Sequence, residues 1–173
     1  MLSFTEQARI YGGFHRRQET KYMHIVSILL LFLSAFIFLG FFHVLMPGIF
    51  EITLASITTV VLLVYYFYLN WRLALVLTPV LLFLLWISNM ISYSGPSTFS
   101  VWALILILIL SGLTLGIGYY FEGRKPPLRV GLLQLLIEPM FLTAEVFFMA
   151  GKMRPLQNDI YGIGDHEDII EAK

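Results

Sequence analysis

The chain has 173 residues, of which 58% are hydrophobic and only 13% are charged, and its mean hydropathy is +0.82. Soluble domains carry about a quarter charged residues, and a soluble fold of this length leaves roughly a third of its unfolded surface in water. This composition excludes a soluble globular domain and indicates an integral membrane protein. A net charge of zero gives no support to nucleic-acid binding, and the absence of cysteine excludes disulfide-stapled folds and thiol chemistry.

Four apolar runs are each close to the roughly 20 residues that a transmembrane helix needs, and none contains Lys, Arg or Asp. They cover residues 25–46, 50–69, 73–93 and 101–121. The connections at 47–48, 70–72 and 94–97 are short and rich in turn-forming residues, which favours antiparallel neighbours. The sequence therefore predicts an all-α membrane protein built on an up-down bundle of four transmembrane helices.

The basic residues gather on one side of this bundle. The first and third connections carry none, whereas the amino-terminal segment and the second and fourth connections carry Arg9, Arg16, Arg17, Lys21, Arg72, Arg124, Lys125 and Arg129. Because cytoplasmic loops are enriched in Lys and Arg, both termini are predicted to be cytoplasmic. The membrane would be the endoplasmic reticulum in a eukaryote and the inner membrane in a bacterium.

The segment at 132–150 is apolar but contains Gln134, Glu138 and Glu145, which share one helical face, and Pro139. A span with two carboxylates is costly, so we expect a broken, interfacial or re-entrant helix over about 130–150 that returns to the cytoplasm. Its polar stripe either faces a site or is the wet face of an interfacial helix. This helix completes a membrane domain at 1–154, which a polar cytoplasmic tail follows at 155–173.

Two histidines stand before and at the start of the first span. His15 and His24 are nine residues apart, which on one straight helix places them on opposite sides and about 13 Å apart along the helix axis. They could share a metal if the chain turns between them. The capping-box pattern at 3–6 predicts a short amino-terminal interfacial helix, and Thr20 is a plausible N-cap for the next helix. The alternative is two separate interfacial histidines in contact with water.

Glu122 ends the fourth span on the same side of the membrane. A carboxylate at a helix C-terminus opposes the helix dipole, so a metal, a protonated histidine or an arginine is expected beside it. The alternative is a salt bridge to Arg124 or Lys125.

These residues, in this order, resemble a known family. The pattern consists of Phe14–His15, His24, the run Phe-Glu-Gly-Arg-Lys-Pro-Pro at 121–127, Gln134, Pro139 and Glu145. It is similar to the fungal endoplasmic-reticulum 2-hydroxy fatty acid dioxygenases of phytosphingosine (sphingolipid) breakdown and to their bacterial relatives, over roughly residues 4–151. The resemblance implies an iron(II)-dependent α-oxidation that removes one carbon from a 2-hydroxy fatty acid with molecular oxygen.

The resemblance also implies roles for individual residues. Histidines would hold the iron, so the expected ligands are His15, His24 and Glu122. The expected catalytic carboxylates are Glu122, Glu138 and Glu145. The carboxylate of the fatty acid would be attracted by Arg16, Arg17, Arg124 and Lys125, since each cation near the membrane surface contributes about 1 kcal/mol.

The chain departs from the family at two positions. Thr20 stands where the family usually has Asn, and Gly118 stands where it has a histidine one turn before the glutamate. Either the iron is held by two histidines and a carboxylate, as in other non-haem iron sites, or the activity has been lost. The alternatives to an enzyme are therefore an inactive family member acting as a membrane scaffold, or a small transporter. A transporter should show a midplane charge and inverted repeats, and neither is visible.

Overall fold

The computed structural model describes residues 18–44, 52–122, 132–149, 151 and 158. Five helices make up most of this part of the chain: α2 (Gln18–Gly40), α3 (Leu54–Leu69), α4 (Trp71–Ser92), α5 (Thr98–Glu122) and α6 (Leu132–Met149). The expected all-α fold is confirmed here, with one small addition. Strands β1 (His43–Val44) and β2 (Ile52–Thr53) pair antiparallel between α2 and α3.

Three of these helices are long and apolar enough to cross a membrane: α2 from Tyr22, α4 over its whole length, and α5 up to Gly118. The fourth apolar helix, α3, is shorter, with 16 residues. The described residues thus agree with a helical membrane protein. The four-span bundle stays a prediction.

The first helix lies earlier in the chain than expected. It begins at Gln18, so Thr20 lies inside it, and the N-cap predicted at Thr20 is wrong. It ends at Gly40, because the N–H groups of Phe41 and Phe42 donate to carbonyls only three residues back and close the last turn. The chain then extends into β1, so the span predicted over 25–46 overran the helix.

The loop predicted at 70–72 is reduced to one residue. Asn70 alone separates α3 from α4, so Trp71 and Arg72 belong to a helix and not to a loop. Its side chain accepts hydrogen bonds from the N–H groups of Arg72 and Leu73, while its own N–H donates to the carbonyl of Tyr66. One residue therefore ends one helix and caps the next.

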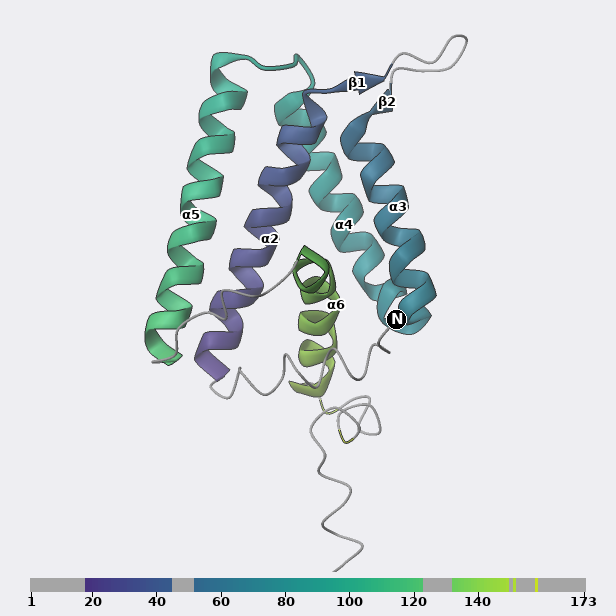
Figure 1. Cartoon of the computed structure of the whole chain (residues 1–173), viewed down its shortest axis with the longest axis vertical. Coiled ribbons are helices and arrows are strands. Elements are labelled where there is room, and N and C mark those ends of the chain that lie inside the picture. The colour runs from purple at the N-terminus through teal and green to yellow at the C-terminus, as the bar shows by residue number, and fades with distance from the viewer. Residues whose placement is uncertain (1–17, 45–51, 123–131, 150, 152–157, 159–173) are drawn as a thin grey trace, which may run out of the picture.

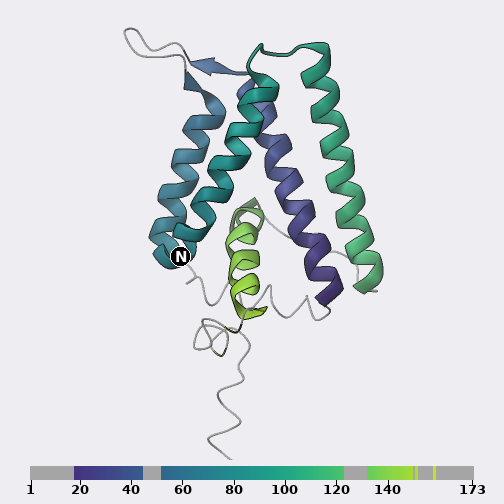
Figure 2. The ribbon, with the colours of Figure 1, turned by 180° about the vertical axis from the view of Figure 1, so that it is seen from behind.

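Figures 1 and 2 show how the helices are arranged. Helices α2, α3 and α4 lie close together at the end that carries the two strands, which we call the hairpin end. They spread toward the opposite end, where α2 begins and α3 and α5 end, and where α6 lies between them; we call this the open end. Helix α5 stands beside α2, its main neighbour.

The close approach at the hairpin end depends on a glycine. A Cβ added at Gly40 would overlap the hydroxyl of Ser92 and lie 3.0 Å from its Cβ. Glycine therefore lets α2 and α4 meet at this end, as small residues do between membrane helices.

Helix α6 is continuous through Pro139, so the broken form among the three expected alternatives is wrong, and the interfacial and re-entrant forms stay predictions. It begins about halfway along the bundle and runs to the open end, so it occupies only that half of the molecule (Figures 1 and 2). Its buried side chains join the core formed by the other helices. This core includes Ile28, Phe32 and Phe36 of α2, Leu73, Leu77 and Leu81 of α4, and Met140, Phe141 and Ala144 of α6.

Candidate functional site at the open end of the bundle

His24 lies in the second turn of α2 at the open end and has no exposed surface. Its imidazole faces α5 at Gly118. A Cβ built on Gly118 would lie 3.4 Å from Nε2 of His24 and 3.6 Å from its Cδ2. These are ordinary van der Waals distances, so an alanine at position 118 would fit and would touch the imidazole, and His24 and Gly118 are direct neighbours across the two helices.

The same two helices are joined further inside the bundle by a reciprocal pair of hydrogen bonds. The hydroxyl of Ser27 donates to the carbonyl of Ser111, and the hydroxyl of Ser111 donates to the carbonyl of Ser27, each over 2.9 Å. Both serines are buried. Small and polar residues at this contact let the two backbones approach closely. The serine pair thus holds α2 against α5 within two turns of the contact between His24 and Gly118.

Two carboxylates of α6 are buried in the open half. Glu138 is 6% exposed and Glu145 is 1% exposed, and they are seven residues apart on one helical face. The interpretation of this stripe as the wet face of an interfacial helix is therefore wrong for these two residues. The third member, Gln134, has a side chain outside the described set. Because a buried carboxylate is costly, two of them on one face point to a functional role.

A tyrosine that the sequence did not single out fixes the position of α6. Tyr66 of α3 is fully buried, and its hydroxyl donates to the carbonyl of Leu136 over 2.6 Å. Leu136 lies in the turn of α6 that precedes Pro139. The hydrogen bond therefore links α3 to the part of α6 that carries Glu138.

No pattern in the sequence singles out Tyr66, since it stands in a run of four aromatic residues at 65–68. The buried positions of α3 are Ala55, Thr59, Leu62 and Tyr66, which follow the three-and-four spacing of one helical face. The neighbouring Phe67 and Tyr68 are exposed.

The predicted iron ligands and the predicted substrate-binding cations are only partly within the described part of the chain. His15, Arg16, Arg17, Arg124 and Lys125 lie outside it. The backbone of Glu122 ends α5 at the open end, one turn beyond Gly118, but its side chain is outside the described set. The convergence of His15, His24 and Glu122 stays a prediction. Among the described residues there is no group of three His, Cys, Asp or Glu side chains that could hold a metal ion.

The open half of the bundle thus contains an imidazole on α2 and two carboxylates on α6, all buried. His43, in contrast, is exposed in β1 at the hairpin end. Nitrogen and oxygen donors of these kinds serve proton transfer and the binding of divalent metals. Comparison with known proteins finds no matching family model, no matching curated protein and no matching solved structure.

Proposed function

We propose that this chain is a membrane-embedded, iron(II)-dependent dioxygenase that shortens 2-hydroxy fatty acids by one carbon, related to the fungal and bacterial enzymes it resembles. The bundle has four spans, and α6 is a re-entrant helix that carries carboxylates to the site. Both termini and the open end face the cytoplasm.

The contact between His24 and Gly118 carries this proposal. The resembled family has a histidine at the position of Gly118, and its iron chemistry requires that histidine to be near the one at position 24. These positions are far apart in the sequence, yet a Cβ at 118 would lie 3.4 Å from Nε2 of His24. The proximity follows from helix packing, so it is independent support for the resemblance.

The donors present fit a two-histidine, one-carboxylate site in kind. His24 supplies one buried imidazole directed at the last turns of α5. His15 and Glu122 are the other two ligands of the proposed site, and both side chains lie outside the described part of the chain. Iron held there would supply the activation of oxygen that α-oxidation needs.

The substrate class is consistent with the position of the site. A 2-hydroxy fatty acid offers a carboxylate and a hydroxyl group at one end and an apolar chain at the other. A site in the open half, close to the ends of α2 and α5, receives the polar end while the chain remains among lipids. Arg16, Arg17, Arg124 and Lys125 provide the positive charge that attracts the carboxylate.

A membrane scaffold without catalytic activity is the second candidate, and one observation favours it. Gly118 provides close packing against His24 but no ligand, so the contact also serves to hold two helices together. The two candidates can be told apart by iron binding, because the dioxygenase requires bound iron and the scaffold does not.

The experiment measures iron bound to the detergent-purified full-length chain after anaerobic incubation with Fe(II), together with the release of a one-carbon-shorter product. His24→Gln should abolish iron binding, because an amide of similar size is a poor substitute for imidazole. His43→Gln is the matched control and should retain iron, since His43 is exposed at the other end. If the wild-type chain and His24→Gln bind equally little iron and form no product, the protein is a scaffold.

A second arm tests position 118. Gly118→His should raise iron affinity and product release, because it restores a donor beside His24. Gly118→Ala is the control, since it adds the same Cβ and a helix-propensity gain of up to about 1 kcal/mol without a ligand. Equal iron binding by the two variants, without turnover in either, would show that the space at residue 118 is not part of a metal site.

A further inference from the structure

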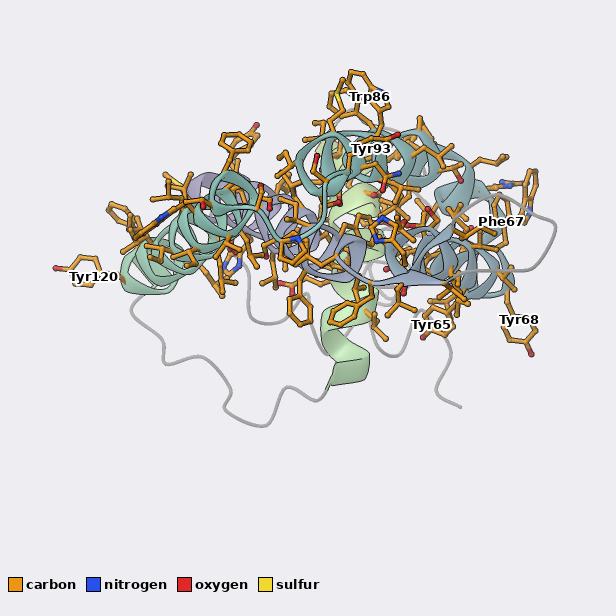
Figure 3. All side chains as sticks on the ribbon, turned by 90° about the horizontal axis from the view of Figure 1, so that it is seen from above. Tyr65, Phe67, Tyr68, Trp86, Tyr93 and Tyr120 are labelled. Carbon is orange, nitrogen blue, oxygen red and sulfur yellow. The ribbon has the colours of Figure 1, made fainter. Side chains whose placement is uncertain are left out.

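The exposed tyrosines and tryptophans of the described residues, all except Trp86, lie at two levels of the bundle, each together with other exposed aromatic side chains. At the open end these are Tyr22, Tyr68, Trp71 and Tyr120, which we call the open-end girdle. At the hairpin end they are Phe42, Tyr93, Phe99 and Trp102, which we call the hairpin-end girdle. Figure 3 shows Tyr68 and Tyr120 pointing away from the helices. Tyr and Trp are enriched where membrane proteins meet the boundary between lipid head groups and hydrocarbon.

The distance between the girdles matches the thickness of a bilayer. On α4, Trp71 and Tyr93 are 22 residues apart, which corresponds to about 33 Å along the helix. On α5, Trp102 and Tyr120 are 18 residues apart, which corresponds to about 27 Å. The usual tilt of about 20° shortens both by a few per cent. The two values bracket the roughly 30 Å of bilayer hydrocarbon.

The surface between the girdles is suited to lipid. Its exposed large side chains are apolar and occur on several sides of the helices, including Val60, Val64, Leu75, Phe83, Leu106 and Leu113. No charged side chain is exposed there in the part of the chain that the structure describes. Arg72 lies at the open-end girdle, with its guanidinium 5.5 Å from the ring of Trp71.

We propose that a lipid bilayer surrounds this surface, with the head groups of one leaflet at the open-end girdle and those of the other at the hairpin-end girdle. This assignment also gives the depth of the candidate site. His24 is two residues inside Tyr22, and Gly118 is two residues inside Tyr120, so their contact lies about 3 Å inward of the girdle.

A ligand at this contact would have its polar group at the head-group boundary of one leaflet and its chain in the hydrocarbon. This last step rests on the proposed function, because only then is the contact a substrate site. The level of the bilayer does not depend on that function.

The three tryptophans provide a direct test. Trp71, Trp86 and Trp102 are 59%, 56% and 60% exposed, so they are equally accessible and differ in depth. Trp86 is seven residues from Tyr93, about 10 Å inward of the hairpin-end girdle, and it points outward in Figure 3. Single-tryptophan chains, with the other two replaced by phenylalanine, are reconstituted in phosphatidylcholine vesicles brominated either near the head group or deep in the acyl chain.

The ratio of deep to shallow fluorescence quenching should be above one for Trp86 and below one for Trp71 and Trp102. In a tryptophan-free chain, Tyr22→Trp and Tyr120→Trp should each give a ratio below one, which tests the open end independently. A ratio for Trp86 as low as that of Trp71 would overturn the assignment.

One further result would overturn the assignment of lipid around α5. Gly112 and Gly116 are four residues apart on α5, with nothing within 4 Å of an added Cβ, a spacing that also permits helix dimerisation. If Trp102 escapes both lipids while Trp71 is quenched, a second copy of the chain covers that face instead of lipid. The measurement requires neither iron nor turnover, so it stands if the proposed enzymatic function fails.

Discussion

The two hydrogen bonds between Ser27 and Ser111 allow a quantitative test of the α2–α5 contact. Each hydroxyl donates to the carbonyl of the other residue, not to the other hydroxyl. Ser27→Ala removes one bond and leaves the other in place, and Ser111→Ala does the reverse. The two substitutions should therefore have additive effects on the free energy of unfolding.

The magnitude follows from interhelical hydrogen bonds in membranes, which contribute about 0.6 kcal/mol on average and up to about 1.7 kcal/mol. Each single substitution should destabilise the protein by this amount, and the double substitution by about 1–3 kcal/mol. If one hydroxyl instead donated to the other, either substitution alone would remove the single bond. The double variant would then be no less stable than the singles.

The assay is reversible unfolding by sodium dodecyl sulfate in mixed micelles, followed by circular dichroism. Ser34→Ala is the matched control, because Ser34 is also buried on α2 but donates to the carbonyl of Leu31 in its own helix. Ser27→Ala, Ser111→Ala and Ser34→Ala gain the same helix propensity from alanine. The amount by which Ser27→Ala lowers the free energy of unfolding beyond Ser34→Ala therefore measures the interhelical hydrogen bond. A loss in Ser27→Ala no larger than in Ser34→Ala, or a double variant equal to a single, would refute the packing described for α2 and α5.

Three other outcomes follow from the structure. Tyr66→Phe should cost about 1 kcal/mol, because it leaves the ring in place but removes the hydrogen bond to Leu136; unchanged stability in the same unfolding assay would show that this bond does not hold α6. Gly40→Ala should cost about 1–3 kcal/mol, since the added methyl group forces α2 away from α4, and a stabilised variant would contradict the close approach. In this cysteine-free chain, Arg72→Cys and Ser94→Cys should be labelled from opposite sides of sealed vesicles, because they lie at opposite ends of α4; labelling of both from one side would exclude α4 as a span.

Composition and the lengths of the apolar runs were sufficient to predict an all-α chain, helices long and apolar enough to cross a membrane, and the order of these helices. The reason is that an apolar run long enough to cross a bilayer must satisfy its own backbone hydrogen bonds, and a helix does so within one segment. Helix ends were predicted less well. Residues 41–46 are as apolar as a span, and only the hydrogen bonds at the end of α2 and the pairing of β1 with β2 showed where the helix stops.

Only the tertiary structure showed which face of each helix is buried and which is exposed. The stretches of α2 and α5 that are apolar enough to cross a membrane have the same mean hydropathy, yet 50% of the residues in the α2 stretch are buried and only 11% in that of α5. In a membrane, lipid-facing and core-facing positions are both apolar, so the periodicity that marks a buried face in a soluble helix is lost. The sequence therefore could not tell the central helix from the peripheral one.

For the candidate site too, the sequence identified residues but not the contacts between them. The sequence singled out His24, Glu138 and Glu145, because polar residues stand out within apolar runs. It singled out Gly118 only through the resemblance, because the resembled family has a histidine at that position. It could not show that His24 faces Gly118, nor that the two carboxylates are buried. Those facts depend on how α5 packs on α2 and on how Tyr66 holds α6 in the open half, and such long-range contacts leave no local pattern in the chain.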